Sequence, residues 1–139
     1  MKKILLLAAI LIATLTVSSC EKAPDDSWTA TVETLDPTDV RAESAYLNAK
    51  ITWSCKAKYA YETGFVIKAE PGATYYDPKA YCIRKDINQL EGTMELHEIN
   101  RHIITGDDTY YYVAYFRMMS GKGEKFIYGQ EKSYHVPGK

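Results

Sequence analysis

The chain has 139 residues, with 17 Lys and Arg against 18 Asp and Glu, 46% hydrophobic residues and 12 tyrosines. This length corresponds to one domain and excludes a large multidomain enzyme. The formal net charge of -1 offers no basic excess to neutralise phosphates, so no nucleic-acid partner is expected. Only 8 Gly and 5 Pro are present, which excludes collagen-like and disordered chains.

Residues 1–19 are predicted to be a signal peptide. Lys2 and Lys3 precede an apolar run over residues 4–17, which as a helix is about 21 Å long and too short for a bilayer core. The run is therefore typical of a cleavable signal rather than a transmembrane helix. It ends in Val-Ser-Ser-Cys at 17–20, which resembles a bacterial lipobox, where small residues precede a cysteine that is acylated and becomes the mature N-terminus.

Cys20 is accordingly predicted to carry the lipid, palmitate among its acyl chains, that anchors the protein to a membrane. Residues 20–27 have no apolar pattern and are interpreted as a lipidated tether. The acidic stretch at 21–27 resembles the export signal of lipoproteins in Bacteroides-type bacteria. This resemblance implies an outer-membrane lipoprotein at the cell surface, with the periplasmic face as the open alternative.

Residues 28–139 are predicted to form one antiparallel β-sandwich, because apolar side chains recur there with a period of two. No segment shows helical periodicity over three turns. In the clearest strand, 44–54, the alternate residues from Ala45 to Trp53 should face the core. The expected strands, in chain order, are 28–33, 44–54, 61–70, 81–86, 94–99, 109–119 and 125–136. Turn residues at 36–39, 71–72 and 121–123 separate several of them, and seven short strands are typical of an all-β sandwich.

The run Ile-Thr-Gly-Asp-Asp-Thr-Tyr-Tyr at 104–111 resembles the tyrosine corner of fibronectin type III domains. Thr109 and Tyr111 stand at the positions of its Thr and Tyr. Three further motifs are similar to fibronectin-like modules of Bacteroides-type surface lipoproteins: Ser-Ala-Tyr-Leu at 44–47, Glu-Thr-Gly-Phe-Val at 62–66, and Tyr-Tyr-Val at 111–113 with Tyr-Gly at 128–129.

The resemblance covers roughly residues 29–136 and implies a seven-stranded fibronectin type III or immunoglobulin-like sandwich. At such a corner the ring of Tyr111 packs inside, and its hydroxyl bonds to nearby backbone. The family implies adhesion, spacing or ligand binding, with no shared catalytic residues. Its usual arginine after Tyr-Tyr-Val is replaced by Ala114, so a binding surface carried by that arginine is lost.

Neither a metal site nor an enzyme active site is expected. The three histidines are His97, His102 and His135, and they lack the three or four converging ligands that a metal needs. A Ser-His-Asp triad stays open from the residue list, but no nucleophile elbow and no Gly-rich phosphate loop occurs. We therefore expect no catalytic residues and no cofactor.

Cys55 and Cys82 remain once Cys20 is committed to lipid. In an oxidising compartment they are a candidate disulfide. In the family topology, however, they lie near opposite ends of the sandwich. The alternative is a pair of half-buried free thiols.

The tyrosines supply the candidate ligand-binding residues. If Tyr111, Val113 and Tyr115 face the core, then Tyr112 and Phe116 face outward. Tyr75 and Tyr76 lie in the loop 71–80, where burial is hard to arrange. Exposed aromatic rings with polar groups are used by sugar-binding and protein-binding surfaces. The alternative is that strands favour tyrosine, and outward rings merely cover their cross-strand neighbours.

Two functions are therefore predicted from the sequence. The first is a lipid-anchored interaction or adhesion module of the cell envelope, without catalytic activity, that binds another envelope protein or a host protein. The alternative is a glycan-binding accessory lipoprotein of a polysaccharide-uptake system, with tyrosine rings as stacking platforms.

Overall fold

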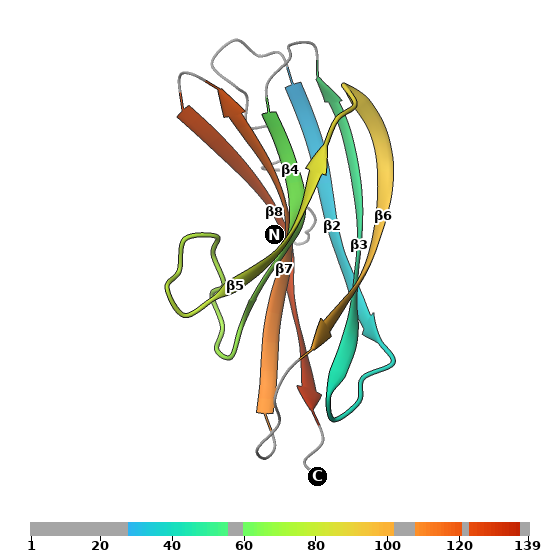
Figure 1. Ribbon diagram of the computed structural model, residues 1–139, viewed down its shortest axis with the longest axis vertical. Helices are drawn as coiled ribbons and strands as arrows, with labels where there is room; N and C mark the ends of the chain where they lie inside the picture. Colours follow the sequence, from blue (N-terminus) through green and yellow to red (C-terminus); the bar gives the residue numbers. More distant parts are fainter. Residues whose placement is uncertain (1–27, 56–59, 102–107, 121–122, 137–139) are drawn as a thin grey trace, which may run out of the picture.

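The computed structural model describes residues 28–55, 60–101, 108–120 and 123–136. They form two antiparallel sheets (Figure 1), one with strand order β2-β3-β6 and the other with order β5-β4-β7-β8. The strands are β2 (Trp28–Thr38), β3 (Ser44–Cys55), β4 (Ala60–Lys68), β5 (Tyr81–Ile87), β6 (Glu91–Arg101), β7 (Asp108–Ser120) and β8 (Gly123–Val136). The expected all-β class is confirmed.

Several predictions fall outside the described residues. These are the signal peptide at 1–19, the tether at 20–27 with Cys20, His102, and the first part of the motif at 104–111. Within the described part of the chain, no helix is long and apolar enough to cross a membrane.

The predicted alternation in β3 is confirmed. Every second residue from Ala45 to Trp53 is buried, whereas Lys50 and Thr52 between them are exposed. Trp28 begins the corresponding buried row of β2. The apolar faces of the two sheets therefore pack against each other in a sandwich-like core.

Phe116 lies at the centre of the aromatic part of this core. Its ring centroid is 5.9 Å from that of Trp28, 6.2 Å from that of Trp53 and 5.7 Å from that of Tyr61. These rings come from both sheets, and pairs at such distances add about 0.5–1.5 kcal/mol each beyond the burial of their area.

Two strands are longer than the sequence pattern predicted. β2 runs on to Thr38 through the expected turn, with a register shift between Leu35 and Thr38. β6 begins at Glu91 and pairs with β3 along its whole length to Arg101. Ladder hydrogen bonds to β3 hold these polar ends in the sheet, which a hydrophobic pattern does not record.

The central strand β7 is buried on both faces, which corrects the predicted orientation of its aromatic residues. Tyr112 and Phe116 are fully buried between the sheets rather than outward. Val113 and Tyr115, expected in that core, belong to a second apolar cluster on the outer face of the four-stranded sheet. The alternation of the sequence correctly separated these residues into two faces of β7. It did not show which face meets the other sheet, because both faces are covered, and the prediction chose the wrong one.

The same inversion applies to the expected tyrosine corner. Tyr111 is half-buried in the strand position between Tyr110 and Tyr112, whose rings pack with the inter-sheet core, so it lies on the opposite face. The expectation that its ring packs inside is therefore wrong. Tyr112 instead donates a hydrogen bond from its hydroxyl to the backbone oxygen of Leu35, at 2.6 Å.

β2 closes one side of the sandwich against an irregularity in the four-stranded sheet. The register of β7 and β8 shifts between Val113 and Tyr115, and the backbone N–H of Ala114 donates to Oγ1 of buried Thr34 at 3.1 Å. A Cβ at Gly129 would lie 2.5 Å from the same oxygen. Glycine is therefore required where β2 crosses β8 this closely.

Candidate functional site

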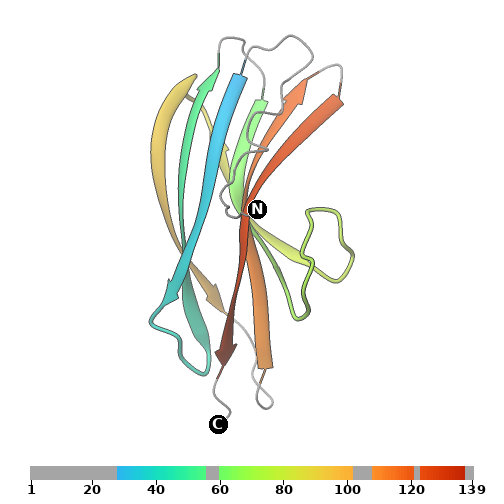
Figure 2. The ribbon, with the colours of Figure 1, turned by 180° about the vertical axis from the view of Figure 1, so that it is seen from behind.

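The connection between β4 and β5, residues 69–80, folds back over the outer face of the four-stranded sheet. In Figures 1 and 2 it projects from the side of the sandwich opposite β2, β3 and β6. The Glu131 carboxylate accepts hydrogen bonds from the backbone N–H groups of Gly72 (2.9 Å) and Ala73 (3.2 Å). Lys68 and Asp77 form an ion pair. The connection is thus tied to the end of β4 and to β8.

Tyr75 anchors the connection on the sheet. Its ring centroid is 5.3 Å from that of Tyr115 and 5.0 Å from that of Phe126. Two guanidinium carbons lie over the same ring, that of Arg117 at 4.8 Å and that of Arg84 at 5.4 Å. Both arginines also donate to the Tyr75 hydroxyl oxygen at 3.0 Å. Burial raises the pKa of Tyr75, so its hydroxyl is protonated at neutral pH.

Gly64 is the residue of β4 next to this anchor, and the sheet therefore has no side chain at that position. It pairs with Arg84 on one side and with Tyr115 on the other, and both of these residues contact Tyr75. Gly64 has a φ of 153°, and a Cβ there would lie 1.8 Å from the backbone oxygen of Ile83. Only glycine is compatible with this backbone.

Arg117 forms ion pairs with two carboxylates. Its Nη2 lies 2.6 Å and its Nε 2.7 Å from Oε1 of Glu124. Its Nη1 lies 3.5 Å from Oε1 of Glu62, whose other oxygen accepts a bond from the Tyr115 hydroxyl at 2.5 Å. Burial and this bond to Glu62 raise the pKa of Tyr115. The network holds Arg117 under the connection with its charge compensated.

Tyr76 stands at the edge of this network and is 64% exposed. Its hydroxyl donates to Oε2 of Glu124 at 2.6 Å and accepts from Nη2 of Arg117 at 3.1 Å. The bond from Tyr76, followed by Arg117, holds the pKa of the Glu124 carboxyl below its usual range. An exposed ring is therefore fixed in one orientation before any ligand arrives. We call the group of Tyr75, Tyr76, Arg84, Arg117, Glu124 and Phe126 the Tyr–Arg surface.

The four predicted ligand-binding residues divide into two pairs. The structure brings Tyr75 and Tyr76 together in the Tyr–Arg surface, with ring centroids 4.9 Å apart. Tyr112 and Phe116 are fully buried in the inter-sheet core, where a ring offers no surface to a ligand. Sequence reasoning missed the arginines, because nothing in the spacing of Arg84 and Arg117 shows that both approach one loop tyrosine.

The two remaining cysteines are free thiols. Cys55 packs in the inter-sheet core, and Cys82 packs in the outer cluster on β5. Cys55, at the end of β3, lies in the core between the two sheets, whereas Cys82 packs on the outer side of the four-stranded sheet, so the candidate disulfide is not formed. Burial raises the pKa of both thiols.

The histidines do not form a ligand set in the described residues. His97 stacks on Tyr46 with centroids 4.3 Å apart and contacts Asn48 through Nδ1 at 2.6 Å, on the outer face of the three-stranded sheet. His135 contacts Thr109. In the described part of the chain, no group of three or more His, Cys, Asp or Glu side chains could hold a metal ion.

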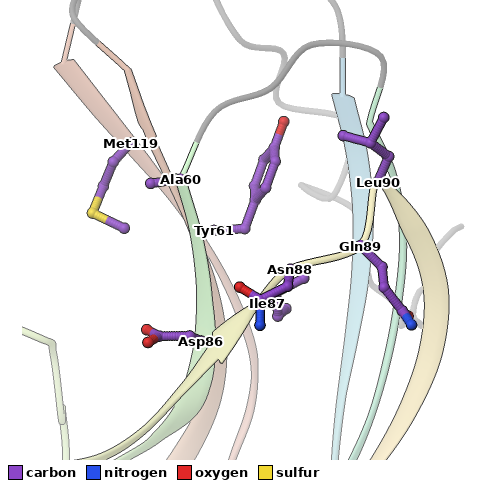
Figure 3. A pocket seen from close by; sticks show the side chains of 8 residues that line it. All are labelled: Ala60, Tyr61, Asp86, Ile87, Asn88, Gln89, Leu90 and Met119. Carbon is purple, nitrogen blue, oxygen red and sulfur yellow. The ribbon is translucent and has the colours of Figure 1, made fainter.

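A groove of about 510 Å³ lies at the end of the sandwich near the β5–β6 turn. Figure 3 shows Tyr61 standing between Met119 on one side and Leu90 on the other, with Asp86 below Tyr61 on the side of Met119. Its lining also contains Ala60, Ile87, Asn88 and Gln89. Asp86 is the one ionisable carboxylate among these described lining residues, and no histidine, cysteine or serine faces it there.

No protein-family model matches the chain, and neither does a curated protein or a solved structure.

Proposed function

We propose that the protein is a lipid-anchored interaction module of the cell envelope, without catalytic activity, that binds a protein partner through the Tyr–Arg surface. The observation that carries this proposal is the exposed ring of Tyr76, fixed by two hydrogen bonds beside arginines that stack on Tyr75. Tyrosine and arginine dominate the residues that contribute most to protein–protein binding. A ring that is already ordered also loses little conformational entropy on binding.

The strand orders β2-β3-β6 and β5-β4-β7-β8 support a seven-stranded fibronectin type III-like sandwich. In that fold the chain likewise crosses between two antiparallel sheets, and the strands are joined by Greek-key connections. In this assignment Cys20 carries the lipid, and the tether at 20–27 places the sandwich close to an outer membrane, at the cell surface.

The glycan-binding alternative has weaker support. Sugar stacking needs exposed ring faces, yet Tyr112 and Phe116 are buried and Tyr75 is covered by two guanidinium groups and two neighbouring rings. Tyr76 is the one ring of the predicted four with a largely exposed surface. A single fixed ring surrounded by ionised groups fits a protein contact better than an extended sugar platform.

Partner capture tests the proposal. The full chain, in neutral detergent, would be immobilised and exposed to an envelope extract of its own organism and to a glycan array, alongside Tyr76→Ala. The matched control is Tyr46→Ala, which removes a ring from the outer face of the other sheet. We expect a discrete protein that Tyr76→Ala loses and Tyr46→Ala retains. Equal capture by all three proteins would refute the assigned surface, and array signals lost in Tyr76→Ala would establish the glycan alternative instead.

A further inference from the structure

The two arginines of the Tyr–Arg surface differ in how their charges are compensated. Arg117 is 17% exposed and contacts both Glu62 and Glu124. Arg84 is exposed, and the ion pairs of the described residues involve its neighbours Lys85 and Arg117 but not Arg84 itself. One guanidinium on this surface is thus available to an external anion.

The position of Arg84 is nevertheless fixed. Its Nε donates to the Tyr75 hydroxyl at 3.0 Å, and its guanidinium carbon lies 5.4 Å from the centre of the Tyr75 ring. The Nε bond leaves the two terminal nitrogens, a planar pair of donors that matches the two oxygens of a carboxylate. Stacking and one hydrogen bond therefore orient the guanidinium of Arg84 before an anion binds, which lowers the entropic cost of binding.

None of the described carboxylates nearest to Arg84 in the fold forms an ion pair with it. Glu62, on the neighbouring strand, bonds Tyr115 and Arg117. The bond to Tyr75 and, to a smaller extent, the charge of Glu62 raise the pKa of Arg84. Asp86, two residues along β5, is exposed and forms none of the ion pairs found among the described residues. Gly64, directly across from Arg84, has no side chain to cover the guanidinium.

We propose that the partner of the Tyr–Arg surface presents an acidic peptide segment, that Arg84 binds a carboxylate of that segment, and that the segment also contacts the exposed ring of Tyr76, which packs against the same Tyr75 as Arg84. This inference rests on the proposed function and specifies the chemistry of the same surface. Charge complementarity decides the occupant: an exposed, oriented guanidinium that forms no ion pair among the described residues selects an anion. The fixed ring of Tyr76, which packs against the same Tyr75, supplies apolar contact area.

The test uses the full chain in neutral detergent micelles and a capped peptide of alternating Glu and Gly, with a Gln–Gly peptide as the uncharged control. Binding is followed by the NMR shift of the Arg84 Nε–H resonance. We expect this resonance to move with the Glu peptide alone. Arg84→Gln loses one charge-assisted contact pair and should bind the Glu peptide about tenfold more weakly. Arg84→Lys keeps the charge but not the planar pair of donors, so its affinity should lie between those of Arg84→Gln and the unmodified chain.

Arg41→Gln is the matched control, because Arg41 is an exposed arginine paired with Asp39 in the β2–β3 connection. Equal weakening by Arg41→Gln, or no movement of the Arg84 resonance, would overturn the inference. A response to polygalacturonate but not to the Glu peptide would also overturn it, in favour of an acidic glycan. If Arg84→Gln still captures the envelope partner that Tyr76→Ala loses, the proposed function stands and the carboxylate inference fails.

Discussion

Replacing Tyr75 by alanine should separate the β4–β5 connection from the sheet and lower the stability of the whole domain. The substitution removes a half-buried ring that contacts Tyr115 and Phe126 and lies under two guanidinium groups. Burial of such a ring is worth about 1.5–2 kcal/mol, and its aromatic and cation–π contacts add about 1 kcal/mol. We therefore expect a loss of about 2–3 kcal/mol, which lowers Tm by roughly 10 °C in a domain of this size.

The matched variant is Tyr76→Ala. Its ring is largely exposed, so the main loss is that of its hydroxyl bonds to Glu124 and Arg117, and the free energy of unfolding should fall by only about 1 kcal/mol. Thermal unfolding followed by circular dichroism measures both variants. The reasoning is refuted if Tyr75→Ala melts like the unmodified protein, or if Tyr76→Ala is equally destabilised. A double substitution would confuse stability with binding, so the two tyrosines must be replaced separately.

Three further predictions concern the fold around the site. Gly64→Ala should lower the free energy of unfolding by about 3 kcal/mol or prevent folding, because the added Cβ would collide with the backbone. A denaturant midpoint equal to that of the unmodified chain would contradict this prediction. Tyr112→Phe removes the donor to the Leu35 carbonyl and should cost about 1 kcal/mol in the same titration, whereas no loss would show that the bond contributes nothing. Lys68 lowers the pKa of Asp77 below its unfolded value of about 4. The stability from this pair is therefore present above about pH 4 and is lost as the pH falls through the folded pKa. Asp77→Asn should flatten this acidic part of a plot of Tm against pH, and an unchanged plot would refute the assignment.

The sequence was sufficient to predict the all-β class and the inward row of β3, because one face of that strand is buried and the other is exposed. It was insufficient for β7, where Tyr112 and Tyr115 are both fully buried on opposite faces. Alternation separates two faces but does not say which one meets the other sheet when both are covered. The outer cover comes from a connection whose path depends on long-range bonds, such as those from Gly72 to Glu131.

The candidate site was predicted only in part for the same reason. Tyr75 and Tyr76 stand out in the sequence because they are adjacent aromatics in a Pro- and Gly-flanked loop. Arg84 and Arg117 lie on different strands, and their approach to Tyr75 depends on Gly64 and on the course of the connection. Contacts between residues 9 and 42 positions apart have no signature in a single sequence.

Photo-crosslinking in living cells tests the central claim most directly. p-Benzoylphenylalanine would replace Tyr76 in the full chain, with the same replacement at Tyr46 as the control on the other sheet. The account predicts a discrete, protease-sensitive adduct of higher mass from position 76 and none from position 46. The absence of an adduct at position 76, or the same adducts from both positions, would contradict the claim that the Tyr–Arg surface binds a protein partner.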